Sequence, residues 1–403
     1  MSELSYLEKL LDGVEVEWRN LGDTSLFEIA NNGRKPVKAS LRIAGETPYY
    51  GANNIQDYVD GYTHDGEYVL IAEDGSASLE NYSIQYATGK FWANNHVHVV
   101  RGKERVHSRF LYHYLCIVNF LPFLTGGGRA KLTKGQLIEI PVPIPCPDNP
   151  EKSLAIQSEI VRILDKFTAL TAELTAELNM RKKQYNYYRD QLLSFKEGEV
   201  EWKTLGEIGK WYGGGTPSKN KIEFWENGSI PWISPKDMGR TLVDSSEDYI
   251  TEEAVLQSST KLIPANSIAI VVRSSILDKV LPSALIKVPA TLNQDMKAVI
   301  PHENILVKYI YHMIGSRGSD ILRAAKKTGG SVASIDSKKL FSFKIPVPNI
   351  NEQQRIVEIL DKFDTLTNSI TEGLPREIEL RQKQYEYYRD LLFSFPKPET
   401  VSN

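Results

Sequence analysis

Three glycine-rich turns hold the residue types of this 403-residue chain that are best suited to bind phosphate. Each combines glycines with a hydroxyl and cations, in the segments Thr125–Lys131, Gly213–Lys219 and Lys326–Ser331. Bare backbone amides beside a hydroxyl and a cation suit a close approach to phosphate. Ordinary surface loops have the same composition, so both interpretations stay open for any one turn.

Two basic clusters favour the phosphate interpretation. Residues 90–109 contain five lysines and arginines against one acid, and residues 317–339 contain six against two. The net charge of the whole chain is −3, whereas proteins that simply coat DNA are usually basic. A role in binding nucleic acid must therefore rest on these local patches or on basic partner subunits.

Amide, imidazole and guanidinium side chains near the same turns could read base edges, because each base pair presents its own pattern of donors and acceptors. Any of them could equally be a solvated polar residue. The candidates for base reading are Asn53, Asn94, Asn95 and His96 in the first half of the chain and Lys219, Arg273, Ser274, Gln294 and Lys297 in the second. The other expected DNA contacts are Lys90, Arg129, Lys131, Gly214, Gly215, Thr216, Ser218, Lys326, Lys327, Thr328, Gly329 and Gly330.

No motif for catalysis is apparent. The sequence has no Gly-x-x-x-x-Gly-Lys-Ser/Thr loop, and Asn-Pro-Glu at 149–151 departs from the Asn-Pro-Pro-aromatic signature of amino-methyltransferases. His96 and His98 share one strand face and could hold a metal, but no further ligands are apparent. Glu73 and Asp74 could be a nuclease carboxylate pair, but no nearby lysine completes it. The pattern predicts a binding protein with no catalytic residue, metal or cofactor of its own.

The elements that must position these residues are repeated, because the chain is a tandem duplication. Four segments recur: Val16–Gly22 as Val200–Gly206, Ile140–Pro143 as Ile345–Pro348, Ile160–Phe167 as Ile356–Phe363, and Gln184–Asp190 as Gln384–Asp390. The stretches between them, roughly 24–138 and 208–343, barely match. The pattern indicates a constant framework that carries two variable domains.

The constant segments predict long helices. Apolar residues recur at the alternating spacing of a coiled-coil seam, at Ile160, Ile163, Phe167, Leu170 and Leu174 and again at Ile356, Ile359, Phe363, Leu366 and Ile370. Such a seam can also be the core of a single domain. Two copies in one chain favour pairing with each other, and a two-fold axis across the helices makes the pair antiparallel. Gly373 and Pro375 predict a kink in the second helix.

Each variable domain is predicted to contain short strands and turns with modest helical content. The expected strands are Tyr68–Ala72, Phe91–Val100, Ser267–Arg273 and Leu292–Ile300, with helices near 108–120 and 304–324. The fold class is therefore α+β: two mixed α/β domains separated by two long helices that form an antiparallel coiled coil, with pseudo-two-fold, quasi-circular symmetry. The expected boundaries are 1–152 for the N-terminal segment with the first domain, 153–197 for the central helix, 198–350 for the second domain, and 351–403 for the C-terminal helix and tail.

The N-terminal segment is similar to the end of a constant helix, since Tyr6–Leu11 matches Tyr188–Leu193 in pattern. We expect it to pack near the C-terminal helix and close the symmetric arrangement. The sequence contains no apolar run of 18 residues and no signal-peptide region at its start. Its two cysteines, Cys116 and Cys146, lack the spacing of a metal site. These features predict a cytoplasmic protein.

Over essentially its whole length, the chain resembles the specificity subunits of type I restriction–modification enzymes. The two Ile-Pro-Val-Pro junctions, the two Ile-Leu-Asp-Lys-Phe helices and the two Gln-Tyr-x-Tyr-Tyr-Arg-Asp ends carry the resemblance. Gly-Gly-Thr-Pro-Ser at 214–218, with Ile-Pro-Trp at 230–232, is typical of a target-recognition domain of this family. The first variable domain matches less distinctively, mainly through Pro48–Ala52.

The resemblance implies a role in sequence recognition. Each target-recognition domain would read one half of a split site in double-stranded DNA, while the helices would set the spacing of the halves and dock two methylation subunits. Those subunits would bring S-adenosylmethionine and methylate adenine, and two restriction or motor subunits would bring ATP and Mg²⁺ for translocation and cleavage. Two other classes stay open from the residues alone: a stand-alone site-specific nuclease, and a coiled-coil adaptor whose domains bind proteins.

Overall fold

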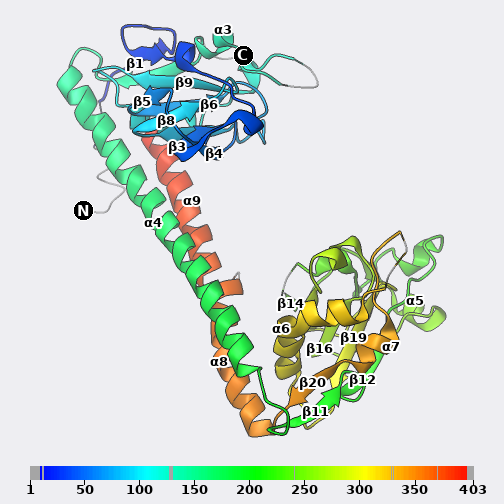
Figure 1. Cartoon of the computed structure of the whole chain (residues 1–403). Coiled ribbons are helices and arrows are strands. Elements are labelled where there is room, and N and C mark those ends of the chain that lie inside the picture. The colour runs from blue at the N-terminus through cyan, green and yellow to red at the C-terminus, as the bar shows by residue number, and fades with distance from the viewer. Residues whose placement is uncertain are drawn as a thin grey trace. The chain divides into compact units, whose positions relative to one another are not determined.

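The computed structural model describes residues 10, 13–126, 130–239, 241–327, 329, 331–369 and 371–396 (Figure 1). These residues form two compact units. Unit 1 is drawn from Met1–Glu173 and Glu379–Asn403, and unit 2 from Leu174–Ile378. Each unit therefore contains one variable region and parts of both long helical segments. Within these ranges, none of the helices combines the length and the hydropathy needed to span a membrane.

The main sheet of unit 1 is antiparallel and has four strands. Their order is β2 (Phe27–Ile29), β9 (Val97–Gly102), β6 (Tyr68–Ala72) and β7 (Ile84–Ala87). The whole of β6 is buried, as expected of a short continuous apolar run inside a sheet. Val69 and Ile71 pack in the core that includes residues of α2 (Ser108–Leu115), whereas Tyr68 and Leu70 belong to a separate core. Because side chains of a strand alternate between faces, β6 is buried on both sides.

A second four-stranded sheet completes the globular part of unit 1. Its order is β4 (Ile55–Val59), β3 (Ala44–Tyr50), β8 (Lys90–Ala93) and β5 (His64–Asp65). β3 and β8 run parallel, with Tyr49 opposite Trp92. Phe91 and Ala93 of β8 pack with Leu70 of the main sheet in the separate core. The layers are therefore α2, the main sheet and the second sheet.

Unit 2 repeats this architecture with dissimilar residues. Its main sheet has the order β12 (Gly209–Gly213), β19 (Met296–Pro301), β16 (Ser267–Val271), β17 (Ser283–Ile286) and β14 (Leu242–Val243). Its smaller sheet is β15 (Tyr249–Ile250), β13 (Ile230–Ile233) and β18 (Thr291–Leu292). β13 and β18 are parallel, as β3 and β8 are, and α6 (Val307–Ala325) packs on the main sheet as α2 does. The two variable regions therefore share one fold although their sequences barely match.

The strand expected at Phe91–Val100 proves to be two strands. Between β8 and β9 the side-chain oxygen of Asn94 accepts a hydrogen bond from the backbone N–H of His96 at 2.8 Å and fixes a turn. The strand expected at Leu292–Ile300 is broken in the same way, because Asn293 fixes a turn between β18 and β19. Apolar residues alternate on both sides of each turn, which hid the break, and the buried asparagine is the signal for it.

The constant segments pair with one another at the base of each variable region. β1 (Val16–Asn20) is antiparallel to β10 (Pro141–Pro145), and β11 (Glu201–Thr204) is antiparallel to β20 (Lys344–Val347). Each Val-Glu-Trp motif therefore lies beside an Ile-Pro-Val-Pro motif. Proline fits here because a two-stranded ribbon consists of edge strands. Short helices also occur, namely α3 (Lys134–Leu137), α5 (Glu252–Gln257) and α7 (Ser337–Ser342).

The long helices are α4 (Pro150–Leu192), α8 (Ile350–Asn368) and α9 (Leu374–Leu392). In unit 1, α9 lies beside the first part of α4, where the rings of Phe167 and Tyr388 stack at 5.2 Å between centroids (Figure 1). In unit 2, Tyr188 of α4 stacks on Phe363 of α8 at 5.7 Å. The end of α4 leads into β11 and the start of α8 follows its partner β20, so these helices run antiparallel. The predicted antiparallel pairing is confirmed.

The kink expected near Gly373 is a complete break between α8 and α9. Gly373 has a φ of +87°, which favours glycine. A Cβ at this position would lie 2.4 Å from the carbonyl oxygen of Thr365, so no side chain fits. α8 ends at Asn368, where Ser369 turns to an extended conformation, and Gly373 lies directly before α9, which begins next to Pro375.

A buried histidine ties each variable region to both long helical segments. In unit 1, Nε2 of His113 donates to Asp165 of α4 at 2.8 Å, and its Nδ1 accepts from the hydroxyl of Tyr385 of α9 at 3.2 Å. Burial lowers the pKa of His113 to about 4, so the ring is neutral. The corresponding residues of unit 2 are His312, Asp361 and Tyr185, at 3.0 and 3.2 Å. Each cluster thus takes its aspartate from its own repeat and its tyrosine from the other.

Both ends of the described chain belong to unit 1. Leu10 packs against the core that includes Leu392 and Phe393. The indole N–H of Trp18 donates to the carbonyl oxygen of Pro396 at 2.8 Å. These contacts agree with the expected packing of the N-terminal segment near the C-terminal helix; residues 6–9 and 11 of that segment lie outside the described residues.

Candidate nucleic-acid interface

Segments that are distant in sequence meet at one end of the main sheet of unit 1. The backbone N–H of Glu73 donates to the carbonyl oxygen of His96 at 2.8 Å, and the N–H of Leu132 donates to the carbonyl oxygen of Glu73 at 2.8 Å. Asn53 joins them, because its side-chain amide donates to the carbonyl oxygen of Gly75 at 2.8 Å. Loop surface 1 is the name used below for residues 53, 73–75, 94–96 and 130–132.

The same arrangement recurs in unit 2. The N–H of Val272 donates to the carbonyl oxygen of Asp295 at 2.8 Å, and the N–H of Ile335 donates to the carbonyl oxygen of Val272 at 2.8 Å. The glycine-rich turn joins them through Gly215, whose N–H donates to the carbonyl oxygen of Leu292 at 2.9 Å. Loop surface 2 is the name used below for residues 213–219, 272–274, 293–295, 326–327, 329 and 331–335.

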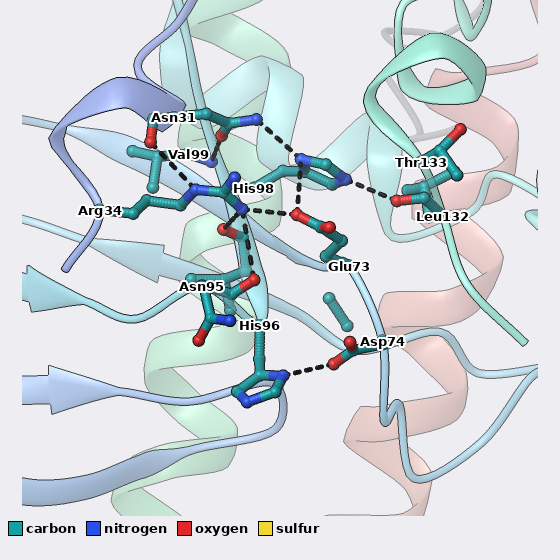
Figure 2. A network of polar contacts seen from close by, with 12 residues as sticks. Asn31, Arg34, Glu73, Asp74, Asn95, His96, His98, Val99, Leu132 and Thr133 are labelled. Atoms are coloured by element: carbon teal, nitrogen blue, oxygen red, sulfur yellow. Dashed lines mark hydrogen bonds and ion pairs between the residues drawn. The ribbon is translucent and has the colours of Figure 1, made fainter. Parts of the chain in front are cut away.

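A polar network holds loop surface 1 in place (Figure 2). Nη1 of Arg34 donates to Oε2 of Glu73 at 2.6 Å, and Nζ of Lys131 lies 2.9 Å from its Oε1. Burial acts to raise the pKa of Glu73, but the hydrogen bonds from Arg34 and Lys131 outweigh it and hold that pKa below its usual range. The carboxylate is therefore charged and bound to two cations. The expectation that no lysine lies near Glu73 was wrong, since Lys131 binds it. Because both cations hold this carboxylate as an ion pair, the geometry gives no support to Glu73 as a nuclease carboxylate.

His98 completes the network with both ring nitrogens. Its Nε2 donates to the carbonyl oxygen of Leu132 at 2.7 Å, and its Nδ1 accepts from the side-chain amide of Asn31 at 2.9 Å. Burial lowers the pKa of His98, which fits a neutral ring in this tautomer. Sequence reasoning missed Asn31 and Arg34, because their partners lie 67 and 39 residues away along the chain. In the part of the chain that the structure describes, no three or more His, Cys, Asp or Glu residues are grouped to hold a metal ion.

The candidates for base reading in unit 1 are placed in two ways. Asn94 is 3% exposed and fixes the turn before β9, and Asn53 holds the loop after Asp74 through its amide. Asn95 and His96 are exposed on loop surface 1, and Nδ1 of His96 lies 2.5 Å from Oδ1 of Asp74 (Figure 2). The first two therefore position the surface, whereas the other two are available to a ligand.

The cations expected near loop surface 1 are placed unevenly. Lys90 lies at the opposite end of β8, with its ammonium 4.8 Å from the centre of the Tyr62 ring. Lys131 is on the surface but paired with Glu73. Arg129 lies outside the described residues. Further ion pairs within the basic cluster of residues 90–109 are Arg101 with Glu28 and Arg109 with Asp165.

Packing requires two glycines in the turn at 213–219. A Cβ at Gly214 would lie 1.7 Å from the carbonyl oxygen of Asn293, and a Cβ at Gly215 would lie 2.9 Å from the backbone nitrogen of Thr260. The turn therefore approaches the one at Asn293 more closely than any side chain allows. Contact of these glycines with phosphate stays a prediction.

The rest of that turn carries polar groups toward the same place. The hydroxyl of Thr216 donates to Oε1 of Gln294 at 2.9 Å, which links the turn to the one before β19. The carbonyl oxygen of Ser218 accepts from the indole of Trp225 at 3.1 Å, and Lys219 is exposed. Thr216 and Gln294 thus lie together on loop surface 2, and Lys219 follows three residues after Thr216 in the same turn.

Arg273 and Ser274 lie in the segment after β16, separated from the strand by Val272. The Arg273 side chain is 58% exposed, and its Nε lies 4.0 Å from Oδ1 of Asp295. The hydroxyl oxygen of Ser274 accepts from the N–H of Ile276 and starts a 3₁₀ turn, η6 (Ser275–Asp278). Arg273 is therefore an exposed cation on the surface, whereas the hydroxyl of Ser274 is used to cap the 3₁₀ turn.

The remaining candidates of unit 2 differ in their surroundings. Lys327 is exposed on loop surface 2, while Nζ of Lys326 lies 2.6 Å from Oδ1 of Asp278. Lys297 is the second residue of β19 and pairs with Gly213 of the glycine-rich turn, and its ammonium lies 5.8 Å from the centre of the Phe341 ring. Gly329 has a φ of +87°, which glycine adopts readily. Thr328 and Gly330 lie outside the described residues.

Comparison with known proteins gives a consistent result. The family model for the type I restriction modification DNA specificity domain matches residues 14–181 and 197–380. The chain is 71% identical to the type I restriction enzyme EcoR124I/EcoR124II specificity subunit of Escherichia coli, with both chains covered completely. It is 47% identical to a putative type I restriction enzyme specificity subunit of Haemophilus influenzae, covering 97% of this chain and 98% of the relative. Among solved structures, the type I restriction–modification S subunit of M. genitalium has a TM-score of 0.60 at 16% identity, covering 96% of this chain and 98% of that one.

Proposed function

The chain belongs to the specificity subunits of type I restriction–modification systems, and from this premise we propose that each unit reads one half of a bipartite DNA site. The observation that carries the proposal is the pair of loop surfaces. Two units with the same fold and the same backbone hydrogen bonds present different side chains at the same place. An arrangement of this kind suits two readers of two different sequences, held by one framework.

Loop surfaces 1 and 2 are the proposed DNA contacts. Exposed amide, imidazole and guanidinium groups on them suit base edges in the major groove, and the exposed lysines suit phosphates. The residues on the surface are Asn95, His96, Lys131, Thr216, Lys219, Arg273, Gln294 and Lys327. Asn94 and Asn53 contribute by fixing the loops instead of by touching bases.

The long helices are the proposed spacer and docking surface. The tetrapeptide Thr-Ala-Glu-Leu occurs at 171–174 and again at 175–178 inside the continuous helix α4. One further copy lengthens a helix by about 6 Å, which compares with one to two base-pair steps of about 3.4 Å. We expect an insertion after Leu178 to widen the gap between the half-sites and to leave the bases read unchanged. Methylation footprinting checks this, and an unchanged gap would contradict the spacer role.

The chemistry is assigned to partner subunits. Two methylation subunits would bring S-adenosylmethionine and methylate one adenine in each half-site, after flipping the base out of the duplex. Two restriction or motor subunits would bring ATP and Mg²⁺ for translocation and cleavage of unmethylated DNA. This chain would hold the register on DNA without a cofactor or metal of its own. A complex that methylates the chromosome would work in the cytoplasm.

Mapping of methylated adenines across the genome of cells that carry the complete complex tests the proposed function. The expected result is one motif with two defined halves separated by a fixed gap of unspecified bases. A continuous motif, or methylation without sequence preference, would contradict the proposal. Metal-dependent cleavage by the purified chain alone would favour the stand-alone nuclease, which the family assignment does not support. The family assignment does not support the protein-binding adaptor either. Salt-dependent retention of the complex on DNA would argue against that adaptor.

A further inference from the structure

Two positions correspond between the loop surfaces by their backbone contacts. His96 and Asp295 each stand immediately before the strand that follows the turn, β9 in unit 1 and β19 in unit 2. Their carbonyl oxygens each accept from the first residue after the neighbouring strand, Glu73 or Val272. Asp74 and Arg273 come next along the chain, and they pair with Lys131 and Ser334 in isolated β-bridges. Asp74 therefore corresponds to Arg273, and His96 corresponds to Asp295.

Both positions form a pair in each unit, but the acid and the base are exchanged. In unit 1 Oδ1 of Asp74 lies 2.5 Å from Nδ1 of His96, with the two side chains 38% and 50% exposed (Figure 2). In unit 2 Nε of Arg273 lies 4.0 Å from Oδ1 of Asp295, with the two side chains 58% and 26% exposed. The second residue after the central strand, Asp74 or Arg273, is thus an acceptor in unit 1 and a donor in unit 2.

The pair in unit 2 is incomplete in this structure. Oδ1 of Asp295 is a buried oxygen without a hydrogen-bond partner among the described residues, and such an atom is costly to leave unpaired. Nε of Arg273, at 4.0 Å, is just beyond hydrogen-bonding distance. A movement of about 1 Å would give a charge-assisted hydrogen bond between these two groups. With Nε bound to Asp295, the edge formed by Nη1 and Nη2 would still be able to donate to a ligand, because the Arg273 side chain is 58% exposed.

We propose that this corresponding position determines specificity: Arg273 reads a guanine in the half-site of unit 2, and Asp74 accepts from a base amino group in the half-site of unit 1. The free edge of Arg273 has the spacing to donate to O6 and N7 of guanine, while Asp295 positions it. A carboxylate at the same place accepts from N4 of cytosine or N6 of adenine, and His96 positions that carboxylate. The inference rests on the proposed function and deepens it at the level of single bases.

The test uses the complex with its methylation subunits and a DNA library in which both half-sites are randomised, read out by sequencing of methylated molecules. Arg273→Ala is expected to lower the preference for guanine at one position of one half-site by about 10- to 100-fold, and to leave the other half-site unchanged. Arg273→Lys keeps the charge but loses the fork, so it is expected to lose the same preference while overall methylation stays closer to that of the unaltered complex. Asp295→Asn is expected to give a smaller loss at the same base.

Asp74→Ala is the matched variant in unit 1. It is expected to relax one position of the other half-site, where the preferred base pair presents an amino group. Co-purification with the methylation subunits and a thermal unfolding curve serve as the folding controls for all four variants. If Arg273→Ala does not assemble, Arg273→Lys decides the question through its effect on guanine preference.

A uniform loss of methylation over all library sequences in the arginine variants, without a change of preference, would identify Arg273 as a phosphate contact and overturn the inference. The inference would also be overturned if the Arg273 variants changed the preference for a base other than guanine. The same holds if they changed the half-site that Asp74→Ala affects. The proposed function fails separately, if the unaltered complex shows no bipartite preference in the same library.

Discussion

Loop surfaces 1 and 2 have the same backbone connections, but different interactions hold them together. In unit 1, Glu73 binds two cations and His98 bonds to two neighbouring segments. In unit 2, Val272 takes the place of Glu73, and the loop lies directly on the backbone at Gly214. One fold therefore accepts either a polar network or a close glycine contact at its loop surface. The side chains of the loop surfaces therefore differ between the units while the backbone connections stay the same.

In the constant segments, by contrast, the same interactions occur in both units. The paired strands β1–β10 and β11–β20 and the histidine clusters at His113 and His312 are nearly the same in both units. They fix where each variable region starts and ends and hold it on both helical segments. The framework contacts are repeated in both units, whereas the loop contacts differ. A protein whose two domains recognise different sequences needs this combination.

The largest loss of stability is expected from a substitution at Gly214, where the turn of unit 2 lies on the backbone. Gly214→Ala is expected to destabilise the chain by about 3 kcal/mol or to prevent folding of unit 2, because the new Cβ meets the carbonyl oxygen of Asn293. Gly213→Ala is the control, since nothing lies within 4 Å of a Cβ there. Thermal unfolding of both variants checks the prediction. Equal stability of the two would show that the turn does not depend on this close contact.

Glu73→Gln weakens the polar network that holds loop surface 1. Loss of the charge that binds Arg34 and Lys131 is expected to destabilise the chain by about 2 kcal/mol at neutral pH. Glu28→Gln, which disrupts the more exposed pair with Arg101, is the control and is expected to cost about 0.5 kcal/mol. Chemical denaturation measures both.

Glu73 is also expected to make the stability of the chain depend on pH. The pKa of Glu73 is lowered from its ordinary value of 4.5, so its contribution to stability is complete above pH 4.5 and is lost as the pH falls through the lowered value. Glu73→Gln is therefore expected to flatten the acid side of the stability curve. A curve that stays parallel to that of the unaltered chain would contradict the charged state assigned to Glu73.

Tyr385→Phe and Tyr185→Phe test whether the histidine clusters of the two units contribute equally to stability. Each removes one hydroxyl that donates to a buried histidine at 3.2 Å, so each is expected to cost about 1 kcal/mol. The two sites lie in different units, and the double variant is expected to cost their sum. Equilibrium denaturation checks this, and a clearly unequal pair would show that the two histidine clusters are not equivalent.

Much of the fold could be predicted because it depends on local patterns. The repeat revealed the framework, the seam revealed the paired helices, and the apolar run at Tyr68–Ala72 gave a strand with the observed bounds. The turns at Asn94 and Asn293 were missed, since apolar alternation continues on both sides of them. A buried amide that fixes a turn and an exposed amide that reads a base have the same letter in the sequence.

The sites could be predicted only in outline for a similar reason. Most segments of the two loop surfaces were among the candidates, but residues 73–75 were considered only as a possible carboxylate pair. The roles within the surfaces depend on long-range contacts. Arg34 reaches Glu73 across 39 residues, and Asn31 reaches His98 across 67. No local spacing marks such pairs. The correspondence of Asp74 with Arg273 also emerges only from backbone contacts that the sequence does not show.

The most direct test of the account is an exchange of one variable region. Residues 208–343 would be replaced by the corresponding region of a relative that recognises another site, and methylated adenines would be mapped in cells with the complete complex. The account predicts that one half of the motif changes to that of the relative, while the other half and the gap stay as they were. A change in both halves, or an unchanged motif from an intact complex, would contradict the claim that each unit reads its own half-site.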